Sequence, residues 1–430
     1  MQMEIDDVET AITFPPPPKT LGETGLPSGF VINLISKIMN EGGTMTPADI
    51  SRVIKLPRPI VRSLIDEMVS LQLVESQGLE TASIKSDIRY SLTDLGARWA
   101  IEAMMASQYV GPAPVTLQSF ENQIRHQSIK REQIHREDLR AALSHLVIPE
   151  SIMPQLGPAA NCARSMLLYG EPGNGKTSIA EALGKSFHDV LYFPYALLVG
   201  NQIIQFFDET LHDTVEMADN ADPLDPRWVP CKRPVVIAGG ELTLEMLDLS
   251  FEPSSRFYEA PMHLKALGGI FVLDDFGRQR SAPQEFLNRW IVPLEKGFDI
   301  LSLHTGKKFN VPFDQLVVFS TNIEPEGLSD AAALRRIYFK IFVPSPTKAD
   351  YLEIFERACR DENLTFNAEV AERFFEEHYT QQNIVTSGAH PGFLVKHILA
   401  ACTYLEREPE LSLELLELAW RNVSTSKRLS

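Results

Sequence analysis

The run Gly-Glu-Pro-Gly-Asn-Gly-Lys-Thr at residues 170–177 constrains this chain more than any other feature of its sequence. Two glycines lie five positions apart, and a lysine and a threonine follow, which is the spacing of a phosphate-binding loop. Gly173 and Gly175 permit backbone conformations that a side chain would forbid, so several N–H groups can point toward phosphates. The sequence therefore predicts a site for a nucleoside triphosphate.

The flanking segments fit a site for a nucleoside triphosphate and Mg²⁺. Residues 165–169 read as a short buried strand, and residues 177–185 read as a helix whose N-terminus faces the phosphates. We expect the Lys176 ammonium to contact the β- and γ-phosphates and the Thr177 hydroxyl to bind Mg²⁺. The expected nucleotide-binding residues are Gly170, Pro172, Gly173, Asn174, Gly175, Lys176, Thr177 and Ser178.

Length and composition limit the class of protein and the cellular compartment to which this site can belong. A chain of 430 residues that is 44% hydrophobic predicts two or three domains with ordinary cores. No apolar run approaches the roughly eighteen residues of a membrane helix, and the acidic start differs from a signal peptide, so we expect no membrane contact. Four cysteines without metal or disulfide spacing favour a reducing cytoplasm. The net charge of -17 argues against a protein that coats nucleic acid, although a local basic site remains possible.

The N-terminal quarter predicts a flexible arm followed by a small helical domain. Residues 1–27 are acidic and then proline-rich, without apolar periodicity. Three helical patterns follow, the second with a capping box at Thr46 and Asp49, and then two short strands, 71–75 and 88–92, around a polar loop. Over residues 26–105 this order resembles the winged-helix domain of bacterial transcription regulators.

A winged helix usually contacts DNA through its third helix. Basic and acidic residues balance between positions 30 and 100, however, and the basic cluster of Lys55, Arg58 and Arg62 is followed directly by Asp66 and Glu67. By the charge criterion for nucleic-acid binders, a protein contact and a DNA contact both stay open.

Two apolar strands beyond the loop end in polar residues. Residues 269–273 lead into Asp274 and Asp275, and residues 316–321 lead into Asn322. Carboxylates at such a strand end can hold magnesium and polarise an attacking water. The first strand resembles a Walker B motif, and from about residue 146 to 423 the chain resembles the AAA+ ATPases.

The AAA+ resemblance implies a role for each of these residues. Asp274 would hold Mg²⁺ directly or through water, Asp275 would polarise the attacking water, and Asn322 would orient that water as the sensor 1 residue. Arg335 or Arg336, with Arg335 favoured, would be the arginine finger that reaches the γ-phosphate of a neighbouring subunit. Hence the chain is expected to form a ring-shaped or helical homo-oligomer.

Two departures from the AAA+ pattern bear on activity. The second carboxylate is usually Glu and here is Asp275, whose shorter side chain predicts slower hydrolysis. The lid normally supplies a sensor 2 arginine where this chain reads His-Pro-Gly-Phe-Leu-Val-Lys at 390–396, so Lys396 would have to substitute as a point charge. An ATP-binding scaffold with weak hydrolysis is therefore one alternative.

A hairpin before the sensor 1 strand narrows the resemblance. Residues 294–311 carry two strand-like segments around a turn near 304–307, a mark of the pre-sensor-1 hairpin group, which includes MoxR-type chaperone ATPases. Residues 234–266 read as a second insertion, with an extra strand at 235–237 and a helix projecting toward the pore of a ring.

The whole sequence predicts an α/β fold of the P-loop class, with a parallel sheet sandwiched by helices, an all-α lid and an N-terminal winged helix. The expected parts are an arm (1–27), a winged helix (28–105), a connector (106–145), an ATPase domain (146–345) and a lid (346–430). The expected function is Mg²⁺-dependent ATP hydrolysis that remodels or assembles a protein complex. The alternatives are a DNA-associated ATP switch and the weakly hydrolysing scaffold.

Overall fold

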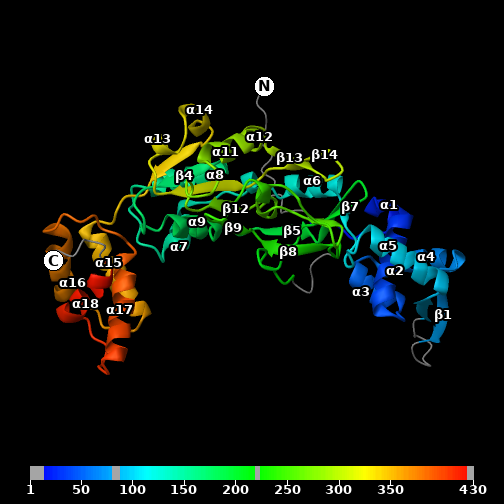
Figure 1. Cartoon of the computed structure of the whole chain (residues 1–430), viewed down its shortest axis with the longest axis horizontal. Helices are drawn as coiled ribbons and strands as arrows, with labels where there is room; N and C mark the ends of the chain where they lie inside the picture. The colour runs from blue at the N-terminus through cyan, green and yellow to red at the C-terminus, as the bar shows by residue number, and fades with distance from the viewer. Residues whose placement is uncertain (1–13, 80–87, 218–222, 424–430) are drawn as a thin grey trace.

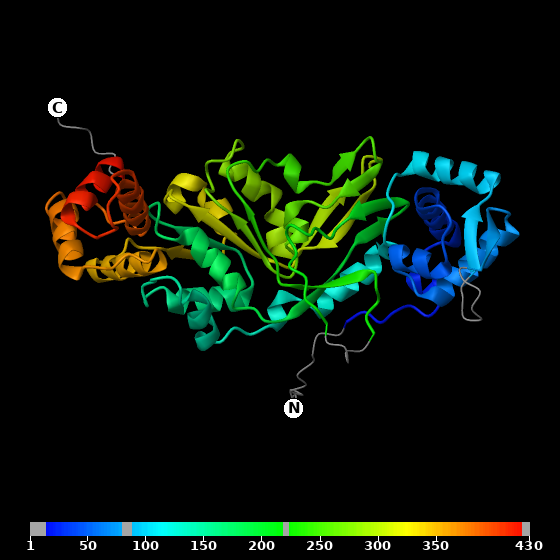
Figure 2. The ribbon, with the colours of Figure 1, turned by 90° about the horizontal axis from the view of Figure 1, so that it is seen from below.

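The computed structural model describes residues 14–79, 88–217 and 223–423. Most of the expected N-terminal arm and the tip of the first hairpin lie outside these ranges. Three parts follow one another in a row, with helices α1–α5 at one end, the sheets in the middle and helices α15–α18 at the other end (Figure 1). The same row is seen from below in Figure 2. Within the described residues no helix combines the length and apolar character that crossing a membrane requires.

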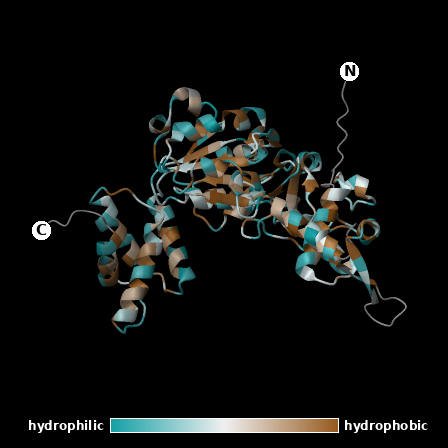
Figure 3. Ribbon diagram, turned by 45° about the vertical axis from the view of Figure 1, so that its right-hand side comes forward, coloured by the Kyte–Doolittle hydropathy of each residue, from teal (hydrophilic) through white to brown (hydrophobic). Residues whose placement is uncertain are grey.

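A five-stranded parallel sheet forms the centre of the molecule. Its strand order is β16-β4-β15-β12-β9, and every neighbouring pair is parallel. The strands are β4 (Met166–Tyr169), β9 (Val235–Ala238), β12 (Ile270–Leu273), β15 (Leu316–Thr321) and β16 (Phe339–Phe342). Such short, continuous apolar runs are typical of a sheet covered on both faces. Figure 3 shows these strands as hydrophobic segments at the centre of the molecule.

Helices cover both faces of this sheet. Leu168, Val272 and Val318 share one core with α7 (Arg136–Leu143), α8 (Met153–Cys162) and α9 (Lys176–Gly184). Leu167, Phe271 and Phe319 point to the opposite face, toward α11 (Pro283–Arg289), α12 (Ile291–Lys296) and α14 (Ala331–Leu334). The expected α/β fold, a parallel sheet between helices, is confirmed.

One expectation about the sheet is wrong. Residues 235–237 were expected to form an extra strand inside an insertion, but they belong to β9, the edge strand of the central sheet. Val235 pairs with Ile270, and Ile237 pairs with Val272, in the parallel ladder with β12. A four-residue apolar run carries no local sign of the strand it will pair with, because that choice is made by tertiary packing.

A second five-stranded sheet, not expected from the sequence, lies between the central sheet and the N-terminal helices. Its order is β10-β11-β7-β6-β3, and its strands are β3 (Val115–Thr116), β6 (Ala196–Val199), β7 (Gln202–Gln205), β10 (Ser250–Glu252) and β11 (Phe257–Glu259). Leu197 and Ile204 share a core with α6 (Leu117–His126), whereas Ala196 and Ile203 share a core with the N-terminal helices. A separate ladder joins β5 (Val190–Pro194) to β8 (Trp228–Lys232).

The N-terminal part contains five helices and one hairpin. The elements are α1 (Leu21–Thr24), α2 (Ser28–Gly42), α3 (Pro47–Ile54), α4 (Arg58–Ser70), β1 (Val74–Leu79), β2 (Ile88–Leu92) and α5 (Asp94–Ala106). The expected capping box at Thr46 and Asp49 is present. Residues 14–18 lie against the body of the protein, unlike the expected flexible arm: Phe14 packs near Tyr192, with ring centroids 6.2 Å apart, and the Pro15 carbonyl accepts from the Asp225 N–H.

The hairpin before β15 is formed by β13 (Phe298–Ser302) and β14 (Lys308–Pro312), as the sequence predicts. Beyond β16 the described chain is helical, with its own core: α15 (Lys348–Asp361), α16 (Ala368–Phe375), the π-helix η3 (Glu376–Thr380), α17 (His390–Tyr404) and α18 (Leu413–Val423). A capping box of Thr347 with Asp350 begins α15.

Candidate nucleotide-binding site

The glycine-rich loop leaves the carboxyl end of β4 and enters α9 at Lys176. Gly173 and Gly175 have φ values of 80° and 77°, a region that side chains disfavour. A Cβ atom on Gly173 would lie 2.4 Å from the Ser387 hydroxyl, and one on Gly170 would lie 2.4 Å from the Val343 carbonyl. The loop therefore requires glycine both for its conformation and for its close packing.

Lys176 joins the loop to the strand that ends in the predicted sensor residue. Its Nζ donates to the carbonyls of Gly170 and Glu171, both at 2.9 Å, and to Asn322 Oδ1 at 2.6 Å. The last contact follows from the strand order, because β4 and β15 are neighbours and their carboxyl ends meet at one edge. Burial lowers the pKa of Lys176, and the nearby carboxylates of Asp274 and Asp275 oppose that shift.

Thr177 and Asp274 also meet at this edge. The Thr177 hydroxyl lies 2.9 Å from both carboxylate oxygens of Asp274. Magnesium bonds of about 2.1 Å put neighbouring octahedral ligands about 3 Å apart. The Thr177 hydroxyl oxygen and one Asp274 carboxylate oxygen therefore have the right separation for two neighbouring positions around Mg²⁺. Within the described ranges no three His, Cys, Asp or Glu side chains gather into a metal site, and the other positions would fall to water and phosphate oxygens.

Asp275 occupies a turn with a left-handed backbone, at φ 49°. Asp and Asn tolerate this region better than most residues do, which suits Asp at this position. Its N–H donates to Asp274 Oδ1 at 3.0 Å, while its exposed carboxylate makes no hydrogen bond within the part of the chain described. Asp275 is therefore both a lining residue of the site and accessible to solvent.

A cavity of about 780 Å³ brings these groups together. It is lined by loop residues 172–179, by Asp274, Asp275 and Asn322, by the apolar segment 146–148, and by residues from α15 and α17. The segments that lead into α15 and α17 also contact the loop: Asn174 donates to Ser345 Oγ at 3.2 Å, and the Gly388 N–H lies 3.4 Å from Asn174 Oδ1. Sequence reasoning missed several lining residues, namely His145, Leu146, Val147, Ile148, Arg278 and Arg357.

The two candidate arginine fingers do not join this site within one chain. Neither Arg335 nor Arg336 lines the cavity. The Arg336 guanidinium pairs with Glu295 at 3.0 Å, while Arg335 is an exposed residue that follows α14. Lys396, the expected lid substitute, does line the cavity from α17.

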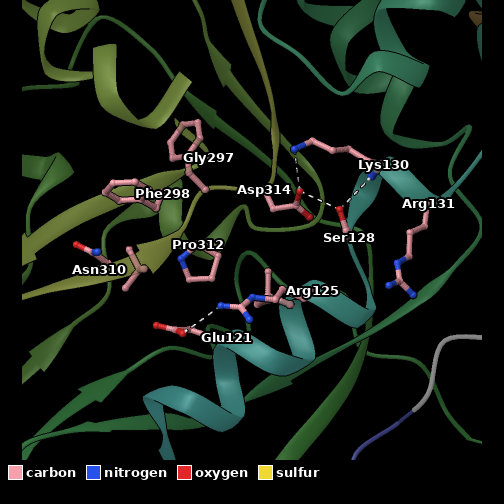
Figure 4. Close-up of a pocket in the computed structure, with 13 residues that line it drawn as sticks. Glu121, Arg125, Ser128, Lys130, Arg131, Gly297, Phe298, Asn310, Pro312 and Asp314 are labelled. Atoms are coloured by element: carbon pink, nitrogen blue, oxygen red, sulfur yellow. Dashed lines mark hydrogen bonds and ion pairs between the residues drawn. The ribbon is translucent and has the colours of Figure 1, made fainter. Parts of the chain in front are cut away.

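A second cavity, of about 670 Å³, lies between α6 and the base of the β13–β14 hairpin (Figure 4). Its cations Arg125, Lys130 and Arg131 are offset in part by Glu121 and Asp314. The Asp314 carboxylate accepts from the Ser128 hydroxyl at 3.0 Å and from the Ile129 N–H at 3.1 Å. These contacts attach the connector to the start of β15.

Comparisons with known proteins agree with the loop and the sheet. Residues 166–237 match the family described as "ATPase family associated with various cellular activities (AAA)", and residues 347–422 match a domain of unknown function, DUF8689. No curated protein matches the chain significantly.

Solved structures of limited similarity are found as well. The Holliday junction branch migration motor RuvB of Thermotoga maritima is 13% identical, with a TM-score of 0.35, over 68% of this chain and 73% of that one. Domain III of the replication initiation protein DnaA from Thermotoga maritima is 13% identical, with a TM-score of 0.36, over 66% of this chain and 96% of that one. From the match at residues 166–237, the chain contains an AAA family domain.

Proposed function

We propose that the chain binds ATP with Mg²⁺ and hydrolyses it to ADP and phosphate. One observation carries this proposal: two remote pairs of polar groups meet at one sheet edge. Lys176 and Thr177 begin α9, whereas Asp274 follows β12 and Asn322 follows β15. Even so, Lys176 Nζ lies 2.6 Å from Asn322 Oδ1, and the Thr177 hydroxyl lies 2.9 Å from both carboxylate oxygens of Asp274. Catalysis of phosphoryl transfer needs mainly such positioning and charge stabilisation.

Each residue then has a defined task. Lys176 holds the β- and γ-phosphates, and the oxygens of Thr177 and Asp274 hold Mg²⁺, which neutralises phosphate charge. The free carboxylate of Asp275 accepts a proton from the attacking water, and Asn322 orients that water through its amide. Residues 146–148 supply an apolar wall suited to the adenine ring.

Hydrolysis is proposed to occur at contacts between copies of the chain. Arg335 is exposed and lies outside its own cavity, and it has no side-chain hydrogen bond or ion pair within the described residues. An exposed guanidinium of this kind is available to a nucleotide that is bound by a neighbouring copy of the chain. A homo-oligomer, ring-shaped in our proposal, therefore completes the site.

The work of the ATPase is proposed to be the remodelling or assembly of a protein complex, in the manner of MoxR-type chaperones, with the N-terminal part as a winged helix that contacts protein. The exposed face of α4 carries Arg58 and Arg62 but also Asp66 and Glu67. Lys55 lies 6.0 Å from the Tyr195 ring of the protein's own body. This mixed surface favours a protein partner over duplex DNA. The domain limits given above are part of this proposal.

The test compares purified wild type with Lys176→Ala and with Lys185→Ala, an exposed lysine just beyond the same helix. We expect phosphate release from Mg-ATP by wild type and by Lys185→Ala, and loss of ATP binding in Lys176→Ala. ATP affinity that is unchanged in Lys176→Ala would refute the site. ATP binding by wild type without any phosphate release would leave only the scaffold alternative.

A further inference from the structure

We propose that Arg278 binds the terminal phosphate of ATP within its own chain, taking the place of an arginine that helix α17 lacks. This inference rests on the proposed function. Arg278 lies outside the glycine-rich loop and is not one of the two carboxylate residues that follow β12.

Arg278 is the cavity arginine without a protein partner. Two arginines line the cavity among the described residues, Arg278 and Arg357. Arg357 donates to the Ser144 carbonyl at 2.8 Å and to Glu353 Oε1 at 2.6 Å. The Arg278 side chain makes no hydrogen bond, ion pair or ring contact within those same residues, so its fork of N–H donors stays available.

The turn that carries Arg278 is held in place by a buried amide. Gln279 is 8% exposed, and its Nε2 donates to the carbonyl of Asp274 at 3.0 Å while its Oε1 accepts from the Gly277 N–H at 2.9 Å. The Arg278 N–H donates to the Asp275 carbonyl at 2.9 Å. The backbone of Arg278 is therefore fixed relative to both strand-end carboxylates.

The same turn is attached to the sensor strand. The Phe276 N–H donates to the Ser320 carbonyl at 2.7 Å, and the Thr321 hydroxyl donates to the Phe276 carbonyl at 2.6 Å. Phe276 is itself fully buried. The backbone from which the Arg278 side chain extends is thus preorganised, which lowers the entropic cost of holding a phosphate.

The cations that helix α17 supplies to the cavity are a further argument for Arg278. Helix α17 contains no arginine, and Lys396 is its only cavity-lining cation among the described residues. A lysine is a mobile point charge, whereas a guanidinium offers two parallel donors that match phosphate oxygens. Arg278 lines the same cavity as Asp275, near which the attacking water and the terminal phosphate would meet.

The test uses Arg278→Ala, Arg278→Lys and the matched control Arg280→Ala, which removes an exposed arginine of the same loop that does not line the cavity. Calorimetry would measure the affinities for Mg-AMP-PNP and Mg-ADP. Charge-assisted hydrogen bonds predict that Arg278→Ala weakens AMP-PNP binding about 10- to 100-fold, with ADP binding changed less than about twofold. Arg278→Lys should recover only part of the loss, and Arg280→Ala should resemble wild type.

Gln279→Ala tests the positioning of the turn. We expect it to reduce the preference for AMP-PNP over ADP, a ratio that general loosening of the fold would not change selectively. The proposal is overturned if Arg278→Ala retains AMP-PNP affinity or loses both nucleotides equally. It is also overturned if the loss occurs only at concentrations where the chain self-associates, because the contact would then be between copies. Wild type that binds neither nucleotide would instead refute the proposed function.

Discussion

At the scale of single residues, the proposed mechanism makes the rate of hydrolysis depend on Asp275. Its carboxylate makes no hydrogen bond to any residue that the structure describes, and its backbone is left-handed, at φ 49°. Asn is nearly isosteric and tolerates the same backbone region, so Asp275→Asn removes the basic group without disturbing the turn.

We expect Asp275→Asn to lower kcat about 10²- to 10⁴-fold, the usual contribution of a general base, while the affinity for Mg-ATP changes less than about twofold. Single-turnover phosphate release and equilibrium nucleotide titration measure the two quantities separately. A variant that turns over as fast as wild type would show that Asp275 is not the base. Weakened ATP binding would show instead that the Thr177–Asp274 pair had been disturbed.

At the scale of elements, the N-terminal helices depend on one very close contact. A Cβ atom on Gly96, in the first turn of α5, would lie 1.9 Å from the Leu73 carbonyl oxygen. Because a backbone atom cannot swing aside, Gly96→Ala should cost at least the roughly 1–3 kcal/mol of an overpacked core. Gly29→Ala in α2, with no atom within 4 Å of the added carbon, is the matched control. Urea unfolding that is equal in the two variants would contradict this packing.

A second prediction at this scale concerns Lys37, which joins α2 to the end of α5. Its Nζ donates to the carbonyls of Ser107 and Tyr109 at 2.9 and 2.6 Å, and burial lowers its pKa to about 8. The unfolded chain, with a pKa near 10.5, binds more protons than the folded chain between these values. The Lys37 contribution to stability should therefore rise as the pH rises from about 8 to 10.5, and stay constant below 8.

The measurement is the free energy of unfolding of wild type minus that of Lys37→Met, at pH 7, 8, 9 and 10. The difference cancels the titration of other groups, such as Cys231, whose pKa burial raises to about 12. We expect the difference to shift in favour of wild type between pH 8 and 10. A difference that is flat with pH, or that shifts in favour of Lys37→Met, would refute the depressed pKa.

The elements also show what a sequence can predict. Strands β4, β12 and β15 and the β13–β14 hairpin were predicted because each is a local apolar run that ends in a distinctive residue. The contact between Lys176 and Asn322 is a consequence of the parallel pairing of β4 with β15, whose carboxyl ends meet at one edge of the sheet. The second sheet was missed because it pairs segments far apart in sequence, such as Val115 with Leu197 and Tyr258 with Ile204. Position alone could have indicated Arg278, since it follows a strand whose carboxyl end faces the site.

At the scale of the whole molecule, the proposed arginine finger predicts that activity is shared between copies. Arg335→Ala should bind ATP like wild type yet turn over about 10³-fold more slowly or worse. Mixing it with Lys176→Ala should restore part of the turnover, because one interface in the mixture would combine an intact loop with an intact Arg335. Absence of recovery at every mixing ratio would leave Arg335 as an ordinary surface residue.

Because of the second sheet, the N-terminal part of the protein cannot be separated from the central part without exposing a sheet edge. Its strands come from the segment before α6, from the excursion after α9 and from the stretch between β9 and β12, so three remote pieces of chain supply one hydrogen-bonded layer. A clone that starts at residue 146 would leave the edge of β6 unpaired and strip the cover from Ala196 and Ile203, and we expect it to aggregate. A clone that ends at residue 346 should stay monodisperse in size-exclusion chromatography, because the helices it omits bury their apolar side chains among themselves. A fusion to another domain should therefore be joined near residue 346, ahead of the C-terminal helices, and not near residue 146.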